Sequence, residues 1–431
     1  MRGRLAHSAT LRLIHLVTER LARTLDFDAA LAALLEGATD LLGVERGSIL
    51  ILDAERKTLS IRSAKGLSEA VVRSTRIVLG TGIAGEVAAT GKPLVLQDVR
   101  EHPGWRRRRA TAHTSDYANH SALCVPLEIR GAVQGVMTFN DKRDGRPFDG
   151  TDLDFALLIA NQAAVVLWSS MLHRQFLDKQ EIEQELAIAG AIQGRLLPQG
   201  VPQLAGFRFA AAQKMCRSVG GDYYDFIPLA DGRLAIAIGD VAGHGLGSAL
   251  LAADARAALR ECLAHGDSLE ACLQHMNDLL QADTSDEMYM TLLLGILDPE
   301  GRLFEFATAG HHMPVLVRRD RVERLPPVGS NIPLGVRRGL RFGLEAPLRL
   351  EPSDLLLLFT DGVWEETDAA GRRFGTSGLE AVLMKSRKRS ESEVVAAIFA
   401  SVAAHRASPE PEDDCTLVVV KCVGERRAEE A

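Results

Sequence analysis

Four short acidic segments, each beside glycine or next to a very apolar stretch, most constrain the fold of this chain. They are VGGDYYDF at 219–226, GDVAGHG at 239–245, TDG at 360–362 and EDD at 412–414. Apolar runs at 234–238, 355–359 and 415–421 adjoin the last three, and such runs are typical of buried strands. One acidic residue at a strand end usually caps a helix or makes a turn. Three of them indicate a common site, because the strands of one sandwich can bring their ends together.

Carboxylates gathered at such an edge would repel one another, and a hard divalent cation removes that repulsion. All-oxygen ligands suit Mg²⁺ or Mn²⁺, whereas the six cysteines contain no C-x-x-C pair, which disfavours zinc. Two such ions about 3.5–4 Å apart can lower the pKa of a bridging water and hold a phosphoryl oxygen. The pattern therefore predicts metal-assisted hydrolysis of a phosphate ester.

The first half of the chain alternates between helical and strand-like patterns. Asp26 or Asp28 can cap a helix that Gly43 would end. The apolar face of that helix is Leu31, Leu34, Leu35, Ala38, Leu41 and Leu42. Strand-like runs follow at 48–52, 59–63, 93–97, 122–129 and 132–140, and a last helix starts after residues 149–152. About 150 residues of this kind suit one α/β domain.

A different pattern joins the two halves. Between Leu172 and Leu196 apolar residues recur near heptad spacing, charged residues fill much of the space between them, and Pro198 ends the run. The pattern predicts a helix of roughly 35–40 Å. Two interpretations stay open: a helix packed on its own domain, or a parallel dimeric coiled coil that transmits a signal. Gly190 and Gly194 lower the intrinsic stability of its last turns.

Composition excludes several classes. The chain has 431 residues, 46% of them hydrophobic, which excludes a wholly disordered protein. A net charge of −7 lacks the field that drives non-specific nucleic-acid binding, and the run Arg106–Arg109 is interpreted as a solvated loop. Scattered cysteines fit a reducing compartment. The apolar stretch Leu157–Trp168 contains Asn161 and Gln162 and looks too short to span a bilayer, so we expect a cytoplasmic protein without membrane insertion.

Three segments of the first half resemble a GAF domain over its full length. They are GTGIAGEVAATGKPLVLQDV, LCVPLEIRGAVQGVMTFNDK and FDGTDLDFALLIANQAAVVL. The resemblance implies an antiparallel sheet flanked by helices that senses a small molecule, light or a partner.

The ligand of this GAF-like region is not predicted. Cyclic-nucleotide-binding members carry an Asn-Lys pair and later an Asp-Glu pair. Here Asp141 separates Asn140 from Lys142, and Leu153 follows Asp152. His113, His120 and Cys124 are residue types that ligate haem or metals, although ordinary loop and strand positions are the favoured interpretation.

The second half, over about residues 185–423, resembles the PPM family of metal-dependent protein phosphatases in its SpoIIE/RsbU-like branch. The matching segments, in family order, are AIQGRLLP, VGGDYYDF, IGDVAGHGLGSALL, MYMTLLLGILDPEGRLFEFATAGHHMPVLV, LLLLFTDGVWE and DDCTLVVVK. The resemblance implies an α-β-β-α sandwich with a dinuclear metal site at one end of its two sheets, and activity on phosphoserine or phosphothreonine.

Carried over residue by residue, the resemblance implies two Mn²⁺ or Mg²⁺ ions. Asp240 would bridge both, and the carbonyl of Val241 would add a ligand. Asp361 and Asp413 would bind one ion each or share one. Asp222 would bind directly or through water. All four aspartates are thus candidate catalytic residues.

Other residues near these motifs have weaker assignments. Asp414 is expected to lie behind the ligands, and Asp225, His311 and His312 to be structural. Arg217 is the nearest candidate to hold the phosphate. No general acid is assigned, because the histidine of the eukaryotic Asp-Gly-His order is displaced here in Asp-Val-Ala-Gly-His.

These observations predict a multidomain α/β protein: a GAF-regulated serine/threonine phosphatase. The expected segments are an N-terminal helix at 1–24, the GAF domain at 25–170, a helical linker at 171–198, the phosphatase domain at 199–423 and a charged tail at 424–431. The resemblance implies a phosphorylated anti-anti-sigma factor of STAS type as substrate, in a partner-switching pathway. The heptad-like helix between the two halves favours a homodimer. Alternatives are a pseudophosphatase that only binds a partner, a GAF sensor with an output dock, and a phosphatase of small molecules.

Overall fold

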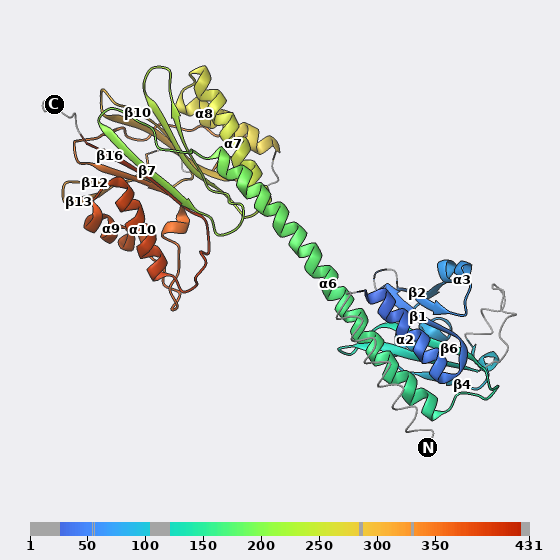
Figure 1. Ribbon diagram of the computed structural model, residues 1–431. Helices are drawn as coiled ribbons and strands as arrows, with labels where there is room; N and C mark the ends of the chain where they lie inside the picture. Colours follow the sequence, from blue (N-terminus) through green and yellow to red (C-terminus); the bar gives the residue numbers. More distant parts are fainter. Residues whose placement is uncertain are drawn as a thin grey trace. The chain divides into compact units, whose positions relative to one another are not determined.

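A computed structural model of the chain describes residues 26–53, 55, 57–103, 121–283, 288–328 and 332–423 (Figure 1). Contacts divide the chain into two compact units, Met1–Gln180 and Glu181–Ala431. The predicted helix at 1–24, the Arg106–Arg109 run, His113, His120 and the tail at 424–431 lie outside the described residues. The division falls inside the predicted linker, and the predicted domain boundaries themselves stay predictions.

The first unit is built on a six-stranded antiparallel sheet in the order β3-β2-β1-β6-β5-β4. Its strands are β1 (Val44–Asp53), β2 (Thr58–Lys65), β3 (Arg76–Val78), β4 (Leu94–Leu96), β5 (Ala122–Ile129) and β6 (Ala132–Lys142). Short helices α3 (Glu69–Ser74), α4 (Gly82–Thr90) and η1 (Val99–Glu101) lie in the connections.

Helix α2 (Phe27–Leu42) starts and ends as the sequence predicts. The Asp26 side chain accepts a hydrogen bond from the Ala29 amide at 2.9 Å, and Gly43 ends the helix with a left-handed φ of 66°. The predicted apolar face is buried except for Leu41, which is 42% exposed. Leu41 was therefore wrongly placed: it lies off the stripe that faces the sheet.

Alternate residues of the strands pack against different helices, as a pleated sheet requires. Residues such as Ile49, Leu123 and Met137 join the core made with α2 and the start of α6 (Gly150–Leu196). Their neighbours Leu50 and Cys124 pack with α4 instead. The sheet is thus covered by helices on both faces, which confirms the GAF-like architecture.

Helix α6 is one continuous helix of 47 residues, where the sequence analysis expected a domain helix followed by a separate linker helix. The chain has no glycine or proline between Thr151 and Ala189, so nothing in its backbone chemistry interrupts the helix. The helix continues through both Gly190 and Gly194 and ends at Leu196, before Pro198.

Among the described residues, α6 is also the one helix long and apolar enough to cross a membrane. Its most apolar window is 39% buried inside the structure, and a core helix of a globular protein passes the same test. The apolar stretch at 157–168 is only one part of this helix, so its length underestimates that of the helix. The absence of membrane insertion stays a prediction.

The second unit contains two five-stranded antiparallel sheets. The first has the order β14-β11-β10-β9-β8 and the second β13-β12-β15-β16-β7. The bounds are β7 (Phe207–Lys214), β8 (Tyr223–Pro228), β9 (Leu234–Val241), β10 (Met290–Asp298), β11 (Leu303–Ala309), β12 (Val315–Arg318), β13 (Arg321–Arg324), β14 (Leu348–Arg349), β15 (Leu355–Phe359) and β16 (Cys415–Cys422).

Helices cover the outer face of each sheet (Figure 1). Ile236 of β9 and Val418 of β16 share the core between the sheets. Ala235 packs outward with α7 (Leu246–His265) and α8 (Leu269–Asp283), and Val419 packs outward with α9 (Gly375–Ser386) and α10 (Glu391–His405). The order of layers is therefore α-β-β-α, as predicted.

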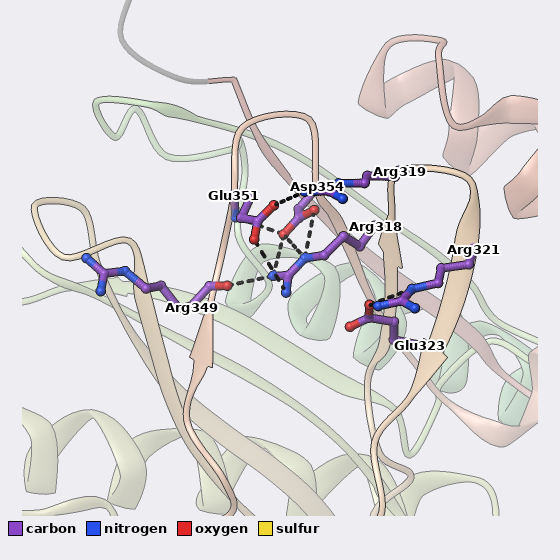
Figure 2. Close-up of polar contacts among 7 residues, drawn as sticks. All are labelled: Arg318, Arg319, Arg321, Glu323, Arg349, Glu351 and Asp354. Carbon is purple, nitrogen blue, oxygen red and sulfur yellow. Dashed lines mark hydrogen bonds and ion pairs between the residues drawn. The ribbon is translucent and has the colours of Figure 1, made fainter.

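A cluster of ion pairs fixes the start of β15 (Figure 2). Arg318 at the end of β12 donates to both carboxylate oxygens of Asp354, at 2.7–3.3 Å, and to the carbonyl of Arg349 at 2.6 Å. Asp354 is 2% exposed and also accepts from the amide of Glu351 at 2.8 Å. Because Asp354 directly precedes β15, these contacts set the position of the strand whose other end carries Asp361.

Candidate active site

One edge of the second unit brings the acidic segments together. Asp222 directly precedes β8, and Asp240 lies at the end of β9, which pairs antiparallel with β8. In the other sheet Asp361 follows β15 in the short helix η2 (Asp361–Val363), and Asp413 precedes the antiparallel neighbour β16. Two strand ends from each sheet therefore meet at this edge, as the sequence pattern predicted.

The Asp222 side chain lies where the two sheets meet. It is 2% exposed, and its Oδ2 accepts hydrogen bonds from Thr360 Oγ1 at 2.8 Å and from Thr416 Oγ1. Both threonines belong to the second sheet, whereas Asp222 belongs to the first. Among the described residues, no donor faces Asp222 Oδ1. A buried carboxylate oxygen without a donor is costly, because burial removes its water without replacing it.

Gly221 allows Asp240 and Val241 to lie against the Asp222 segment. A Cβ at Gly221 would come within 2.7 Å of the Val241 carbonyl oxygen and 3.3 Å of Asp240 Oδ1. The first distance is too short for any side chain. A residue other than glycine would therefore push the Val241 carbonyl and the Asp240 carboxylate away from Asp222.

The carboxylates act on one another electrostatically. Burial raises the pKa of Asp222 well above its usual range, and the charge of Asp240 raises it further. Burial also raises the pKa of Asp240, followed by the charges of Asp361, Asp413 and Asp414. Burial likewise raises the pKa of Asp413. Burial is the largest cause of these shifts, and the neighbouring negative charges add to it; a bound cation would offset both effects.

Asp414 holds the loop that leads to Asp222. Its Oδ1 accepts from the amide of Cys216 at 2.8 Å and its Oδ2 from the amide of Gly221 at 3.0 Å. A Cβ at Gly220 would lie 2.1 Å from Asp414 Oδ2, so this contact also depends on a glycine. Asp414 thus binds backbone amides behind the other carboxylates, in the place expected for it.

His311 joins the two sheets next to the site. Its Nε2 donates to the carbonyl of Phe359 at 3.1 Å, because a carbonyl can only accept, and its Nδ1 lies 2.9 Å from the hydroxyl of Thr291. Burial lowers the pKa of His311 to about 3, so the ring is neutral. Thr291 pairs with Asp240 across β10 and β9. The role of His311 is therefore structural, as expected.

Asp225 is structural as well. It is completely buried and receives two hydrogen bonds from Arg260 of α7, at 2.7 and 2.8 Å. It also accepts from the Tyr223 hydroxyl at 3.0 Å. His244 and Arg217 are exposed, and Arg217 belongs to the loop that leads to Asp222.

The donor set fits a hard divalent cation in chemistry and in charge. It consists of carboxylates and the Val241 carbonyl, it includes the orphaned Asp222 Oδ1, and it carries excess negative charge. The side chains do not form a closed cage: within the described ranges, no three His, Cys, Asp or Glu side chains are grouped so as to hold a metal ion. The roles of individual ligands therefore stay predictions.

Sequence reasoning missed three residues that shape this site. Thr360 and Thr416, which hold Asp222, lie one residue before Asp361 and two after Asp414, so their proximity to the acidic motifs was the available signal. Gln193 of α6 binds the backbone of Gly220 and carries no acidic motif beside it.

Comparison with known families agrees with this architecture. The family described as Stage II sporulation protein E (SpoIIE) matches residues 230–423, and the family described as GAF domain matches residues 24–167. The SiaA-PP2C domain of Pseudomonas aeruginosa has a similar fold, with a TM-score of 0.51 and 24% sequence identity, over 57% of this chain and 98% of that domain.

Two curated relatives each match about half of this chain in sequence. Phosphoserine phosphatase RsbU of Bacillus subtilis is 25% identical over 243 residues, which are 56% of this chain and 71% of RsbU. Protein IcfG of Synechocystis sp. is 25% identical over 264 residues, 55% of this chain but 41% of IcfG. The chain thus spans less than half of IcfG and about seven tenths of RsbU.

Proposed function

Since the chain belongs to the GAF family over residues 24–167 and to the SpoIIE family of PPM-type phosphatases over residues 230–423, we propose that it is a metal-dependent protein serine/threonine phosphatase under GAF control. The observation that carries the proposal is the edge of the sandwich. There burial, followed by the charges of neighbouring carboxylates such as Asp361 and Asp413, raises the pKa of Asp240. Asp222 keeps one buried oxygen without a donor.

Two Mn²⁺ or Mg²⁺ ions are the proposed cofactors. When bound, they supply Lewis-acid activation of water and neutralise charge on the phosphoryl group. Asp240 would contact both ions, and the Val241 carbonyl would add a ligand. Asp361 and Asp413 would bind one ion each or share one. Thr360 and Thr416 fix Oδ2 of Asp222, which leaves its Oδ1 to the metal or to a water.

The proposed substrate is phosphoserine or phosphothreonine on a signalling protein, an anti-anti-sigma factor of STAS type in a partner-switching pathway. The name of the relative phosphoserine phosphatase RsbU supports phosphoserine as the group that is hydrolysed, and the STAS-type carrier rests on the sequence resemblance. The exposed Arg217 stands on the Asp222 loop, where a guanidinium can hold a phosphate. The GAF domain would receive a small-molecule or protein signal, and the helix at 172–197 would pass it to the phosphatase.

We propose a homodimer formed through α6. Seven large apolar side chains between Trp168 and Leu196 are exposed: Met171, Leu172, Phe176, Leu177, Ile182, Ile188 and Ile192. Exposed apolar side chains in this number favour association, and near-heptad spacing in the sequence favours a second copy of the same helix.

A cytoplasmic location is proposed too. Cys124, Cys216, Cys262, Cys272 and Cys415 carry free thiols, which is typical of a reducing compartment.

A second candidate function is a pseudophosphatase that binds a partner without hydrolysis. One observation favours it: in the part of the chain that the structure describes, no three acidic or histidine side chains form a metal cage.

The two candidates differ in turnover. We would measure phosphate release from a phosphoserine STAS-type protein, with and without Mn²⁺, comparing the full chain with Asp240→Ala. Asp231→Ala is the matched control, because Asp231 is an exposed aspartate in the turn at the other end of the β8–β9 hairpin. Manganese-dependent release that is lost in Asp240→Ala and kept in Asp231→Ala supports the phosphatase. No release from the full chain or from residues 181–431, with metal bound, supports the pseudophosphatase.

A further inference from the structure

The last turns of α6 hold the loop at 216–222, which leads to Asp222, by a two-point hydrogen bond. Gln193 Nε2 donates to the carbonyl of Gly220 at 2.7 Å, and the amide of Gly220 donates back to Gln193 Oε1 at 3.2 Å. An amide side chain that satisfies both groups of one residue fixes the orientation of that peptide. Gly220 is two residues from Asp222.

The burial of Gln193 sets it apart from the rest of its helix segment. Between Trp168 and Leu196, all of which the structure describes, Gln193 is the one buried residue, at 8% exposed. The apolar side chains around it, such as Ile188 and Ile192, are exposed instead. A polar side chain buried on a helix with many exposed apolar residues indicates that its hydrogen bonds help to dock this end of α6, next to Leu197, which packs against the cores of the second unit.

A second contact brings the helix backbone against the same loop. A Cβ at Gly190 would lie 2.0 Å from the carbonyl oxygen of Ser218, so only glycine allows this approach. Gly190 and Gln193 lie three residues apart, on the same side of a helix. They therefore contact the loop side by side, at Ser218 and Gly220.

The loop is consequently held from two sides. Asp414 binds the amides of Cys216 and Gly221 from the second sheet, and Gln193 binds Gly220 from α6. The first anchor belongs to the sandwich, because Asp414 directly precedes β16. The second depends on where the end of α6 lies.

We propose that Gln193 is a positioning residue: through Gly220 it sets the place of Asp222 at the carboxylate edge, so that the metal site is complete when the end of α6 is docked. This inference rests on the proposed function and deepens it, because it names the contact through which the helix acts on the site. Displacement of α6 would release Gly220 while the Asp414 contacts remain.

The test uses the full chain and the variant Gln193→Met, which keeps the length and helix preference of the side chain but removes both hydrogen bonds. The matched control is Gln199→Met. Gln199 is exposed and donates to the carbonyls of Gly194 and Leu197 at the same helix end, without touching the loop. Mn²⁺ affinity is measured by titration calorimetry, and amide hydrogen exchange is followed over residues 214–223.

For Gln193→Met we expect roughly tenfold weaker Mn²⁺ binding, as the loss of two buried hydrogen bonds implies. Exchange should speed up at 216–222 and nowhere else in the sandwich, and kcat at limiting Mn²⁺ should fall with KM unchanged. Gln199→Met should match the wild type. Wild-type Mn²⁺ affinity together with wild-type exchange at 216–222 in Gln193→Met would overturn the inference.

The proposed function is judged separately, by turnover of the wild type. If the wild type hydrolyses the phosphoprotein and Gln193→Met behaves identically, the phosphatase stands and the positioning role is wrong. If the wild type shows no turnover, the exchange of 216–222 still decides whether Gln193 holds the loop.

Discussion

The two stretches of α6 are held in different ways. From Gly150 to Leu167 the helix contributes seven buried apolar residues to the core of the first unit: Ala156, Ile159, Ala160, Ala163, Ala164, Val166 and Leu167. From Trp168 to Leu196 seven of its large apolar residues are exposed, the one buried residue is Gln193, and Gly190 lies against the Ser218 carbonyl.

The two kinds of contact differ in how they respond to a small movement of the helix. Apolar burial of about 25 cal/mol per Å² accumulates over many residues and is not lost by any single small shift. A pair of hydrogen bonds adds little net stability and is lost at once when the partner moves. The first stretch therefore acts as part of a domain core, whereas the second buries one of its residues, Gln193.

Ile159→Ala should have the largest effect on stability. Ile159 is completely buried in the first unit, so the truncation leaves a cavity and lowers the free energy of unfolding by about 2–5 kcal/mol. Urea denaturation monitored by hydrogen exchange in β5 and β6 measures it. Val165→Ala, on an exposed position of the same stretch, should change that free energy by less than about 0.5 kcal/mol. Equal effects of the two variants would contradict the comparison.

Gly190→Ala comes next, and it acts on the second unit. The added methyl group meets the Ser218 carbonyl at 2.0 Å, so helix and loop must separate. Such overpacking should cost about 1–3 kcal/mol in the free energy of unfolding and lower phosphate release strongly. Thermal unfolding and phosphate release measure the two effects. A variant with wild-type turnover would show that the loop tolerates an undocked helix.

Phe176→Glu should leave the folding of both units unchanged, because Phe176 is 57% exposed. A charge among the seven exposed apolar side chains of α6 should weaken the proposed dimer and raise its dissociation constant about tenfold or more. Light scattering across a concentration series gives that constant. A wild type that stays monomeric at high micromolar concentration would rule out α6 as a dimer interface.

Gly194→Ala should have the smallest effect, and of opposite sign. No atom lies within 4 Å of a Cβ placed there, so alanine fits and strengthens the helix by about 0.5–1 kcal/mol. Circular dichroism during thermal unfolding detects the gain. Since Gly190 and Gly194 differ by one turn of the same helix, opposite outcomes would isolate the loop contact from helix propensity.

Apolar runs predicted the strands and their acidic ends well, because a buried strand has a local sequence pattern. The α-β-β-α layers were predicted from the resemblance to the PPM family. The apolar runs at 234–238 and 355–359 became β9 and β15, and the acidic residues beside them met at one edge. The sequence could not predict contacts between a residue and a backbone atom that is distant from it in the chain. Gly190 looked like a weak point of a helix, whereas the structure shows it against Ser218.

The same limit applies within the site. The motifs identified the four aspartates, but they did not identify the residues that hydrogen-bond to them or to their loops. Thr416 binds Asp222 across 194 positions of sequence, and Asp414 binds Gly221 across 193. Such pairings follow from the register of β16 beside β7 and β15, which no local pattern specifies.

The place of β16 has a consequence for how the protein is made. In the second sheet β7, the first strand of the domain to leave the ribosome, has β16 as its pairing partner, and β16 is the last strand of the domain to appear. The residues just before β16 include Asp413 and Asp414. A nascent chain therefore has neither a completed second sheet nor a completed carboxylate edge until translation has passed Cys422.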